Sequence, residues 1–289
     1  MSGAPRIVGV IGDPIAHSLS PAIHELWIAR HGLEARYVPL RMTAEAAPAW
    51  VRGFAGFGFT GFNVTTPHKE AAFAAVDAHT PQAAAAGSVN LVSLDGEGRV
   101  LGDSTDGWGF LESLRESAGW RAEGARVAMI GAGGAARAVA AALCAAGARE
   151  IRICNRTSER AKALARGLKT LGAQGVEVWP WPAPEPFFHG VDLIVNGSKL
   201  GMAGDREADG PLWALPALDA TVVATDFVYA PLETPFLAAA KAAGARTVDG
   251  LGMLLHQARP SFEAWFGVRP DADAETRDAA LAALARRAG

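Results

Sequence analysis

The chain has 289 residues, half of them hydrophobic, and a formal net charge of −3 at pH 7. This length and hydrophobic content predict a substantial core and favour two domains, while the interspersed charges exclude the basic faces typical of nucleic-acid and membrane-surface binding. There is no apolar run long enough to cross a bilayer and no signal-peptide pattern at the start, so we expect a cytoplasmic protein.

Short apolar runs typical of strands alternate with helical patterns along the chain. Strands are predicted at residues 6–11, 36–40, 61–64, 126–130, 151–154, 193–196 and 222–226. Helices are predicted at residues 21–31, 70–77, 107–118, 134–146, 159–168, 253–266 and 272–287. The alternation predicts an α/β fold with mostly parallel sheets, and the segment 88–103 predicts a hairpin around a glycine-rich turn.

Two polar motifs follow predicted strands in the N-terminal half. They are GDPIAHSLSPAIH at residues 12–24 and NVTTPHK at residues 63–69. Each contains Ser-Pro or Thr-Pro, and proline suits the first position of a helix, so Ser20 and Thr66 are predicted N-caps. Helix N-termini attract anions, and the hydroxyl, amide and ammonium groups nearby predict a receptor for a small hydroxylated acid.

A glycine-rich loop follows the strand at residues 126–130. Gly131 allows a tight turn and Gly133 lets a pyrophosphate approach the backbone, at the start of a helix whose dipole favours negative charge. The spacing departs from the commonest fingerprint, because Ala136 stands where the third glycine would be. A tight turn into a buried helix, without any cofactor, is the alternative interpretation of this loop alone.

The next predicted strand ends in ICNRTSERA. Asn155 lies near the position, roughly twenty residues after the first glycine, where an acid would hold the ribose 2′-hydroxyl in an NAD enzyme. Here the position is followed by Arg156, Thr157 and Arg160. Guanidinium groups bind phosphate oxygens, so this segment favours NADP, whereas the alternative is a solvated helix start.

The chain closely resembles the shikimate dehydrogenases over nearly its whole length. The blocks that carry the resemblance read, in order, SLSPAIH, NVTTPHK, AGSVNLV, GDSTDGWG, GAGGAARA, NRTSERA, DFVYAPLET and GLGMLLHQARPSFEAW. The resemblance implies NADP-dependent, reversible oxidation of shikimate to 3-dehydroshikimate, a step of chorismate and aromatic amino acid biosynthesis.

The resemblance also implies roles for individual residues. Lys69 would be the acid/base residue, with Asp106 as its catalytic partner. The carboxylate of the substrate would be bound by Ser18 and Ser20. The substrate ring would be contacted by Thr65, Asn90, Asp106, Tyr229 and Gln257. The cofactor would be bound by Gly131, Ala132, Gly133, Gly134, Ala135, Asn155, Arg156, Thr157, Arg160, Phe227 and Gly250.

Elementary chemistry supports the pair of Lys69 and Asp106. Oxidation of a secondary alcohol removes a hydride from carbon and a proton from oxygen, and the protein must accept that proton. A lysine in the first turn of a helix faces a positive dipole end, and both this position and partial burial disfavour its ammonium form. Asp106 at the next helix start can accept a hydrogen bond from the same hydroxyl. Singly, each residue has a structural alternative, an exposed lysine and an ordinary N-cap.

We expect no metal. His17, His24 and His68 lie inside the motifs without metal-ligand spacing, and Cys144 and Cys154 fit buried small side chains. The expected partners are a small ring carboxylate and NADP, with no nucleic acid and no membrane, in a monomer or homodimer.

Three positions depart from the family's pattern. The usual NTD begins with Ser104, the usual NT of the preceding block reads Asn90-Leu91, and the usual NAT reads Asn196-Gly197-Ser198. These changes leave quinate or aminoshikimate open as substrates. A non-catalytic NADP-binding sensor would have to lack Lys69 or Asp106, and the serine block argues against a dehydrogenase of the tetrahydrofolate type.

The motifs divide the chain into three parts. We predict a substrate-binding catalytic domain at residues 1–105 and a Rossmann-type NADP-binding domain at residues 106–249. C-terminal helices at residues 250–289 are predicted to return to the first domain.

Overall fold

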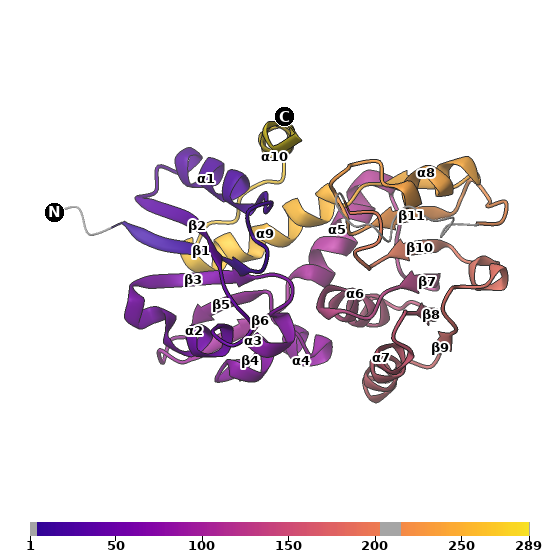
Figure 1. The fold of residues 1–289 in the computed structure, drawn as a ribbon, viewed down its shortest axis with the longest axis horizontal. Coiled ribbons are helices and arrows are strands. Elements are labelled where there is room, and N and C mark those ends of the chain that lie inside the picture. The colour runs from indigo at the N-terminus through magenta and orange to yellow at the C-terminus, as the bar shows by residue number, and fades with distance from the viewer. Residues whose placement is uncertain (1–4, 203–214, 289) are drawn as a thin grey trace. The chain divides into compact units, whose positions relative to one another are not determined.

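The alternating pattern produces two six-stranded sheets, one in each of two compact units of the chain (Figure 1). The structure is a computed structural model that describes residues 5–202 and 215–288. The first unit comprises Met1–Asp106 and Leu254–Gly289, and the second comprises Gly107–Met253. The predicted α/β class is confirmed.

The sheet of the first unit has the strand order β2-β1-β3-β5-β6-β4. Its strands are β1 (Arg6–Gly12), β2 (Ala35–Arg41), β3 (Phe59–Val64), β4 (Ala78–His79), β5 (Leu91–Leu94) and β6 (Val100–Asp103). β1 pairs in parallel with β2 and β3, whereas β5 pairs antiparallel with β3 and β6. The predicted hairpin is therefore confirmed as β5 and β6.

Helices of this unit follow the strands closely. They are α1 (Ser20–Arg30), α2 (Ala47–Gly53), α3 (Lys69–Ala75), α4 (Pro81–Ala86) and α10 (Ala274–Ala288). α10 lies against α1, where the buried Trp27 Nε1 donates a hydrogen bond to Thr276 Oγ1 at 3.0 Å. Arg30 adds an ion pair with Asp273 at 3.1 Å at the edge of this contact.

Both predicted helix caps are wrong. α1 begins at Ser20, so the cap position falls on Leu19, and no side chain caps this helix. α3 is capped by His68 instead of Thr66, because the chain first makes a turn in which the Thr65 carbonyl accepts from the His68 N–H at 3.0 Å.

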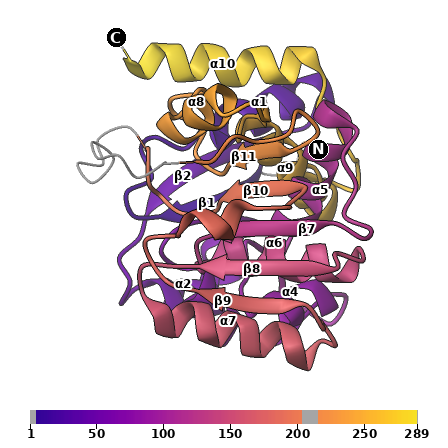
Figure 2. The same ribbon diagram turned by 90° about the vertical axis from the view of Figure 1, so that its right-hand side faces the viewer.

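The sheet of the second unit is wholly parallel, in the order β12-β11-β10-β7-β8-β9. Figure 2 shows β11, β10, β7, β8 and β9 following one another in this order. The strands are β7 (Arg126–Ile130), β8 (Glu150–Cys154), β9 (Val176–Trp179), β10 (Leu193–Asn196), β11 (Val223–Asp226) and β12 (Arg246–Val248). β9 and β12 were not predicted, because both are edge strands with exposed positions and lack a continuous apolar run.

The chain passes between the two units inside helices. α5 (Asp106–Ala118) and α9 (Leu251–Phe266) contain the two passages, and the second unit also contains α6 (Gly134–Ala145), α7 (Ser158–Thr170) and α8 (Pro235–Ala242). In the part of the chain that the structure describes, no helix has both the length and the apolar character that a membrane crossing requires.

His24 is enclosed in an aromatic cluster of the first unit. Its side chain is fully buried, stacks on Tyr37 with ring centroids 4.2 Å apart, and meets the edge of Trp27 at 5.4 Å. Neither ring nitrogen has a hydrogen-bond partner among residues 5–202 and 215–288. Burial disfavours the charged imidazolium and lowers the pKa of His24 to about 3.

We predict that His24 makes the fold sensitive to mild acid. Its pKa is lower in the folded chain than the value of 6.5 in the unfolded chain, so only the unfolded chain gains a proton between these values. The contribution of His24 is complete above pH 6.5 and is lost as the pH falls toward 3, which amounts to about 2 kcal/mol at pH 5. Urea unfolding of the wild type and of His24→Leu at pH 7 and pH 5 measures it. The variant should lose less stability on acidification, and an equal loss in both proteins would contradict the prediction.

Candidate active site

Lys69 and Asp106 form an ion pair in the first unit. Lys69 is the first residue of α3 and Asp106 is the first residue of α5, which confirms that both lie at helix starts, as predicted. Lys69 Nζ donates a hydrogen bond to Asp106 Oδ2, and the two side chains are 13% and 5% exposed. A carboxylate at a helix start is favoured by the dipole, and here it also meets an ammonium group of opposite charge.

The Asn90 side chain is the hydrogen-bond centre of the same cluster. Its Oδ1 accepts from the Thr105 N–H at 2.7 Å, which fixes the orientation of the amide. Its Nδ2 then faces Asp106 Oδ1 at 3.0 Å and Gln257 Oε1 at 2.9 Å. The structure thus brings together four predicted site residues, Lys69, Asn90, Asp106 and Gln257.

Two residues that the sequence-based prediction omitted support this cluster. Thr105 Oγ1 donates to the Gln257 carbonyl at 2.8 Å, so it ties α9 to the start of α5. Asn63 Nδ2 donates to the Asn90 carbonyl at 3.0 Å and to Ser261 Oγ at 2.8 Å. Asn63 belongs to the NVTTPHK motif, and that was the only signal in the sequence that could have indicated it.

Ser18, Ser20 and Thr65 follow strand ends of the same sheet. Strand pairing places Ile11 of β1 opposite Val64 of β3, so the loops after these strands leave from one edge. Ser18 and Ser20 are adjacent through a hydrogen bond from the Ser20 N–H to Ser18 Oγ at 3.3 Å. These positions suit an anion receptor, while their contact with substrate stays a prediction.

The glycine turn of the second unit has the geometry of a phosphate-binding loop. Gly131 has φ of +116°, and a Cβ atom there would lie 2.5 Å from the Gly197 carbonyl oxygen. Gly133 is the N-cap of α6, and a Cβ atom there would have open space around it. The backbone at the start of α6 is therefore accessible to an anion, which fits the pyrophosphate of a dinucleotide.

The remaining predicted cofactor residues leave the carboxyl edge of the same sheet. Strand pairing aligns Ile130, Cys154, Asn196 and Asp226, which are the last residues of their strands. The aligned ends are followed by the glycine turn, by the segment from Asn155 to Arg160, by Gly197 and by Phe227. In parallel α/β sheets, this edge is where nucleotides bind.

Individual contacts hold these segments in place. Asn155 Nδ2 donates to the Thr157 carbonyl at 2.8 Å, and Thr157 caps α7. Phe227 N–H donates to the Asn196 carbonyl at 2.9 Å. A Cβ atom at Gly250 would lie 2.5 Å from the Asp226 carbonyl oxygen, so Gly250 packs directly on the Phe227 segment.

The outer part of the segment at residues 155–160 is accessible to solvent. Arg156, Thr157 and Arg160 are exposed, whereas Asn155 is half-buried. Tyr229, predicted as a substrate contact, lies in the second unit beyond β11 and is half-buried. Among the residues that the structure describes, no three His, Cys, Asp or Glu side chains are grouped as a metal site.

Family models match most of the chain. The model described as "Shikimate dehydrogenase substrate binding domain" matches residues 10–92, "Shikimate / quinate 5-dehydrogenase" matches residues 113–179, and "Shikimate 5'-dehydrogenase C-terminal domain" matches residues 250–274.

Known proteins are similar over nearly the full length. The shikimate dehydrogenase (NADP(+)) of Rhodospirillum rubrum is 46% identical over 282 residues, which cover 97% of this chain and 99% of that protein. A crystal structure of a shikimate dehydrogenase in complex with NADP+ superposes with a TM-score of 0.86 at 33% identity, covering 99% of this chain and 97% of the other. The shikimate 5-dehydrogenase of Thermus thermophilus, solved with NADP(H) and shikimate, gives a TM-score of 0.81 at 38% identity and covers 96% and 99%.

The three departures from the family pattern lie at enclosed positions. Leu91 is buried in β5, and Ser104 Oγ is buried without a hydrogen-bond partner among the described residues. A Cβ atom at Gly197 would lie 3.1 Å from a ring carbon of Phe227. The same Cβ atom would lie 3.1 Å from the Ile130 carbonyl oxygen, so the usual alanine would require small shifts of both the ring and the backbone.

The glycine turn predicts a contrast between two substitutions. Gly131→Ala should destabilise the fold by about 2 kcal/mol or more, because its positive φ and the nearby carbonyl both oppose a side chain. Gly133→Ala should change the free energy of unfolding by less than about 0.5 kcal/mol, since its Cβ atom meets open space. Chemical denaturation of both variants measures the difference, and similar stabilities would contradict this geometry.

Proposed function

The chain belongs to the shikimate dehydrogenase family, and we propose that it catalyses the reversible, NADP-dependent oxidation of shikimate to 3-dehydroshikimate. The observation that carries this proposal is the Lys69–Asp106 pair inside the hydrogen-bonded cluster of Asn90 and Gln257. The relatives named for the same reaction match the chain over nearly its whole length, which supports the same conclusion.

Lys69 is the group that transfers the proton in this proposal. Bound NADP supplies the acceptor for the hydride that leaves the substrate carbon. The Lys69 amine takes the proton of the reacting hydroxyl during oxidation, and its ammonium form returns a proton to the carbonyl oxygen during reduction. An ammonium group has three N–H donors, so one Lys69 side chain can bind Asp106 and a substrate oxygen at the same time.

Asp106 has two roles in this mechanism. Its Oδ2 accepts from Lys69 and its Oδ1 accepts from Asn90, which prevents the carboxylate from rotating. The ionised carboxylate stabilises the ammonium form of Lys69 after proton transfer, and it accepts a hydrogen bond from the reacting hydroxyl. Asp106 therefore orients the hydroxyl and balances the charge.

The other predicted contacts divide between the two ends of the substrate. Ser18 and Ser20 bind the carboxylate, while Thr65, Asn90 and Gln257 bind ring hydroxyls and Tyr229 lies near the ring. The amide groups suit this purpose because they can both donate to and accept from hydroxyl groups.

NADP is held by the carboxyl edge of the second sheet. The backbone from Gly131 to Ala135 binds the pyrophosphate at the start of α6, and Arg156, Thr157 and Arg160 bind the 2′-phosphate. Phe227 and Gly250 complete the cofactor contacts. The exposure of both arginines is compatible with binding of an external phosphate group.

A relative acting on quinate or aminoshikimate is the alternative, because one matching family model is described for both shikimate and quinate. A reduction assay with NADP and NAD against shikimate, quinate and aminoshikimate separates them. The highest kcat/KM should be that for shikimate with NADP. A higher value for another ring acid would overturn the substrate assignment, and no turnover of any would support the non-catalytic sensor.

Two further properties belong to this proposal. The enzyme acts in the cytoplasm, and it is a monomer or homodimer in solution. Sedimentation equilibrium of the purified protein tests the second statement, and a larger assembly would contradict it.

We predict that Lys69→Ala lowers kcat by on the order of a hundredfold or more, because the proton of the hydroxyl loses its acceptor. Steady-state rates of shikimate oxidation at saturating NADP measure the effect. Lys241→Ala is the control, since Lys241 is an exposed lysine paired with Glu233. A loss of only a few-fold in Lys69→Ala would remove Lys69 from the mechanism.

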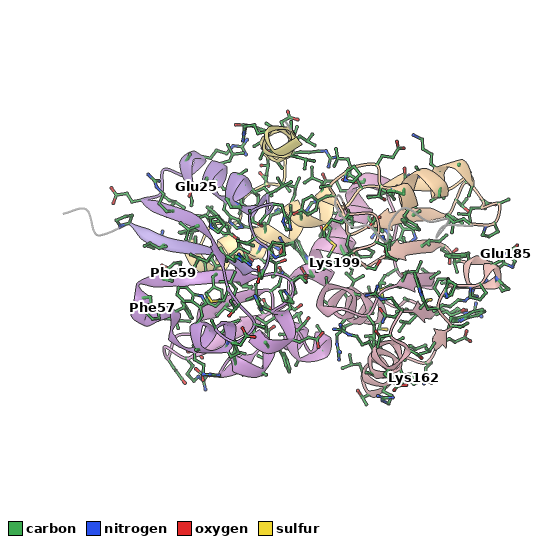
Figure 3. All side chains as sticks on the ribbon, in the orientation of Figure 1. Glu25, Phe57, Phe59, Lys162, Glu185 and Lys199 are labelled. Atoms are coloured by element: carbon green, nitrogen blue, oxygen red, sulfur yellow. The ribbon has the colours of Figure 1, made fainter. Side chains whose placement is uncertain are left out.

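We also predict that Arg156→Ala weakens NADP more than NAD. Loss of one charged hydrogen bond to the 2′-phosphate should raise the Kd for NADP about tenfold and leave the Kd for NAD unchanged. Lys162→Ala provides a control of the same charge, because Lys162, labelled in Figure 3, is an exposed residue of α7, the helix that follows Arg156, and it pairs with Glu159 at 2.8 Å. Equal losses for the two cofactors would show that Arg156 does not bind the 2′-phosphate.

A further inference from the structure

A second buried carboxylate, Asp226, lies at the carboxyl end of β11 in the second unit. It is 1% exposed, and burial raises its pKa to about 6. Its oxygens accept hydrogen bonds from Asn196 Nδ2 at 3.1 Å, Val228 N–H at 2.9 Å and Thr234 Oγ1 at 2.7 Å. None of these donors carries a charge, so the carboxylate is held by dipoles alone.

The Asn196 amide and the Val228 N–H can only donate at this site, and the Thr234 hydroxyl donates there as well. Asn196 Oδ1 accepts from the Ser198 N–H at 3.1 Å, so the amide presents its NH2 group to Asp226. Thr234 Oγ1 accepts from the Leu237 N–H at 3.2 Å, which leaves its single proton for the carboxylate. A backbone N–H is always a donor. The site therefore presents donors to both oxygens of Asp226, and a carboxylate accepts at both oxygens whereas an amide accepts at one.

Asp226 holds residues 197–200, the first part of the loop after β10, through Asn196. Ser198 Oγ donates to Asn196 Oδ1 at 2.6 Å and accepts from the Leu200 N–H at 3.2 Å. Asn196 Nδ2 also donates to the Leu200 carbonyl at 3.0 Å. The amide and the hydroxyl thus close the loop on itself and attach it to the carboxylate.

The glycine turn before α6 packs directly against the backbone of this loop. A Cβ atom at Gly131 would lie 2.5 Å from the Gly197 carbonyl oxygen and 3.1 Å from the Ser198 nitrogen. Gly197 N–H donates to the Ile130 carbonyl at 2.6 Å. A displacement of the loop would therefore displace the turn that precedes α6.

Asp226 also holds the segment after β11. Its bond to the Val228 N–H turns the chain at Phe227, and Gly250 packs on the carbonyl groups of Asp226 and Val228. Thr234 caps α8, so the same carboxylate fixes where the segment re-enters a helix. One side chain thereby connects both loops that contain or support predicted cofactor contacts.

We propose that Asp226 is a positioning residue for NADP, whose ionised carboxylate holds the loops after β10 and β11 in the conformation that the glycine turn requires. This inference rests on the proposed function, because the cofactor contacts at Gly131, Phe227 and Gly250 are part of it. Asp226 itself touches the loops, and it acts on the cofactor through them.

The test compares Asp226→Asn with the wild type by isothermal titration of NADP, together with KM and kcat for the full reaction. Asparagine keeps the shape of aspartate but replaces one acceptor oxygen with an NH2 group, at a site whose neighbours donate to both oxygens. The Kd and KM for NADP should rise about tenfold or more, while kcat at saturating NADP stays within about threefold of the wild type. Asp219→Asn is the control, because Asp219 is an exposed acid that accepts from Thr221 in the turn before β11.

A second variant covers the case in which Asp226→Asn fails to fold. Ser198→Ala removes the hydroxyl that donates to Asn196 Oδ1 and accepts from the Leu200 N–H, and it leaves Asp226 with all its donors, so the Kd for NADP should rise about threefold or more. A wild-type Kd in either folded variant would overturn the proposal. Wild-type protein that binds NADP without oxidising any ring acid would refute the proposed function and leave this inference intact, whereas wild-type protein that does not bind NADP would refute both.

Discussion

The polar cluster of the first unit depends on one primary amide. The Thr105 N–H donates to Asn90 Oδ1 and so fixes the orientation of the Asn90 amide. Asn90 Nδ2 then donates to Asp106 Oδ1, which leaves Asp106 Oδ2 to accept from Lys69. Gln257, from the far end of the chain, joins through the same NH2 group. The direction of each of these hydrogen bonds follows from the contact between the Thr105 N–H and Asn90 Oδ1. The Asp106 carboxylate cannot rotate without breaking its hydrogen bond from Asn90. The proposed proton acceptor, Lys69, is thereby held beside a fixed carboxylate, an arrangement that suits the oxidation of an alcohol.

Local patterns predicted the parts of the fold whose causes are local. The bounds of β7 were predicted to the residue and those of α6 within one residue, because an apolar run, a glycine turn and an alanine-rich helix follow each other without interruption. The helix-start positions of Lys69 and Asp106 were also predicted correctly, because in each case a strand, a short polar segment and a helix follow one another in the sequence. The family was also identified correctly, since the order of eight motifs carries information that no single glycine loop has.

Features that depend on distant residues were not predictable in this way. The caps of α1 and α3 were misplaced because turns before each helix, and not the serine and threonine themselves, decide where it begins. Asn63 donates a hydrogen bond to Ser261, which lies 198 residues further along the chain, and nothing in either local sequence indicates that pairing. The roles assigned to the site residues and the predicted domain limits remain predictions, since hydrogen bonds in the free protein do not establish contact with a ligand.

The division of the chain within α5 and α9 has a consequence for protein engineering. Asp106 precedes one passage between the units and Gln257 follows the other, so the cluster that we propose for proton transfer lies entirely outside Gly107–Met253. That interior stretch contains the glycine turn, the segment of Arg156 and Arg160 and the Asp226 network as one continuous piece of chain. A chimera in which this stretch is replaced by that of an NAD-preferring relative would exchange the proposed nucleotide-binding unit in one step. Tyr229 is the only proposed substrate contact that would be replaced with it.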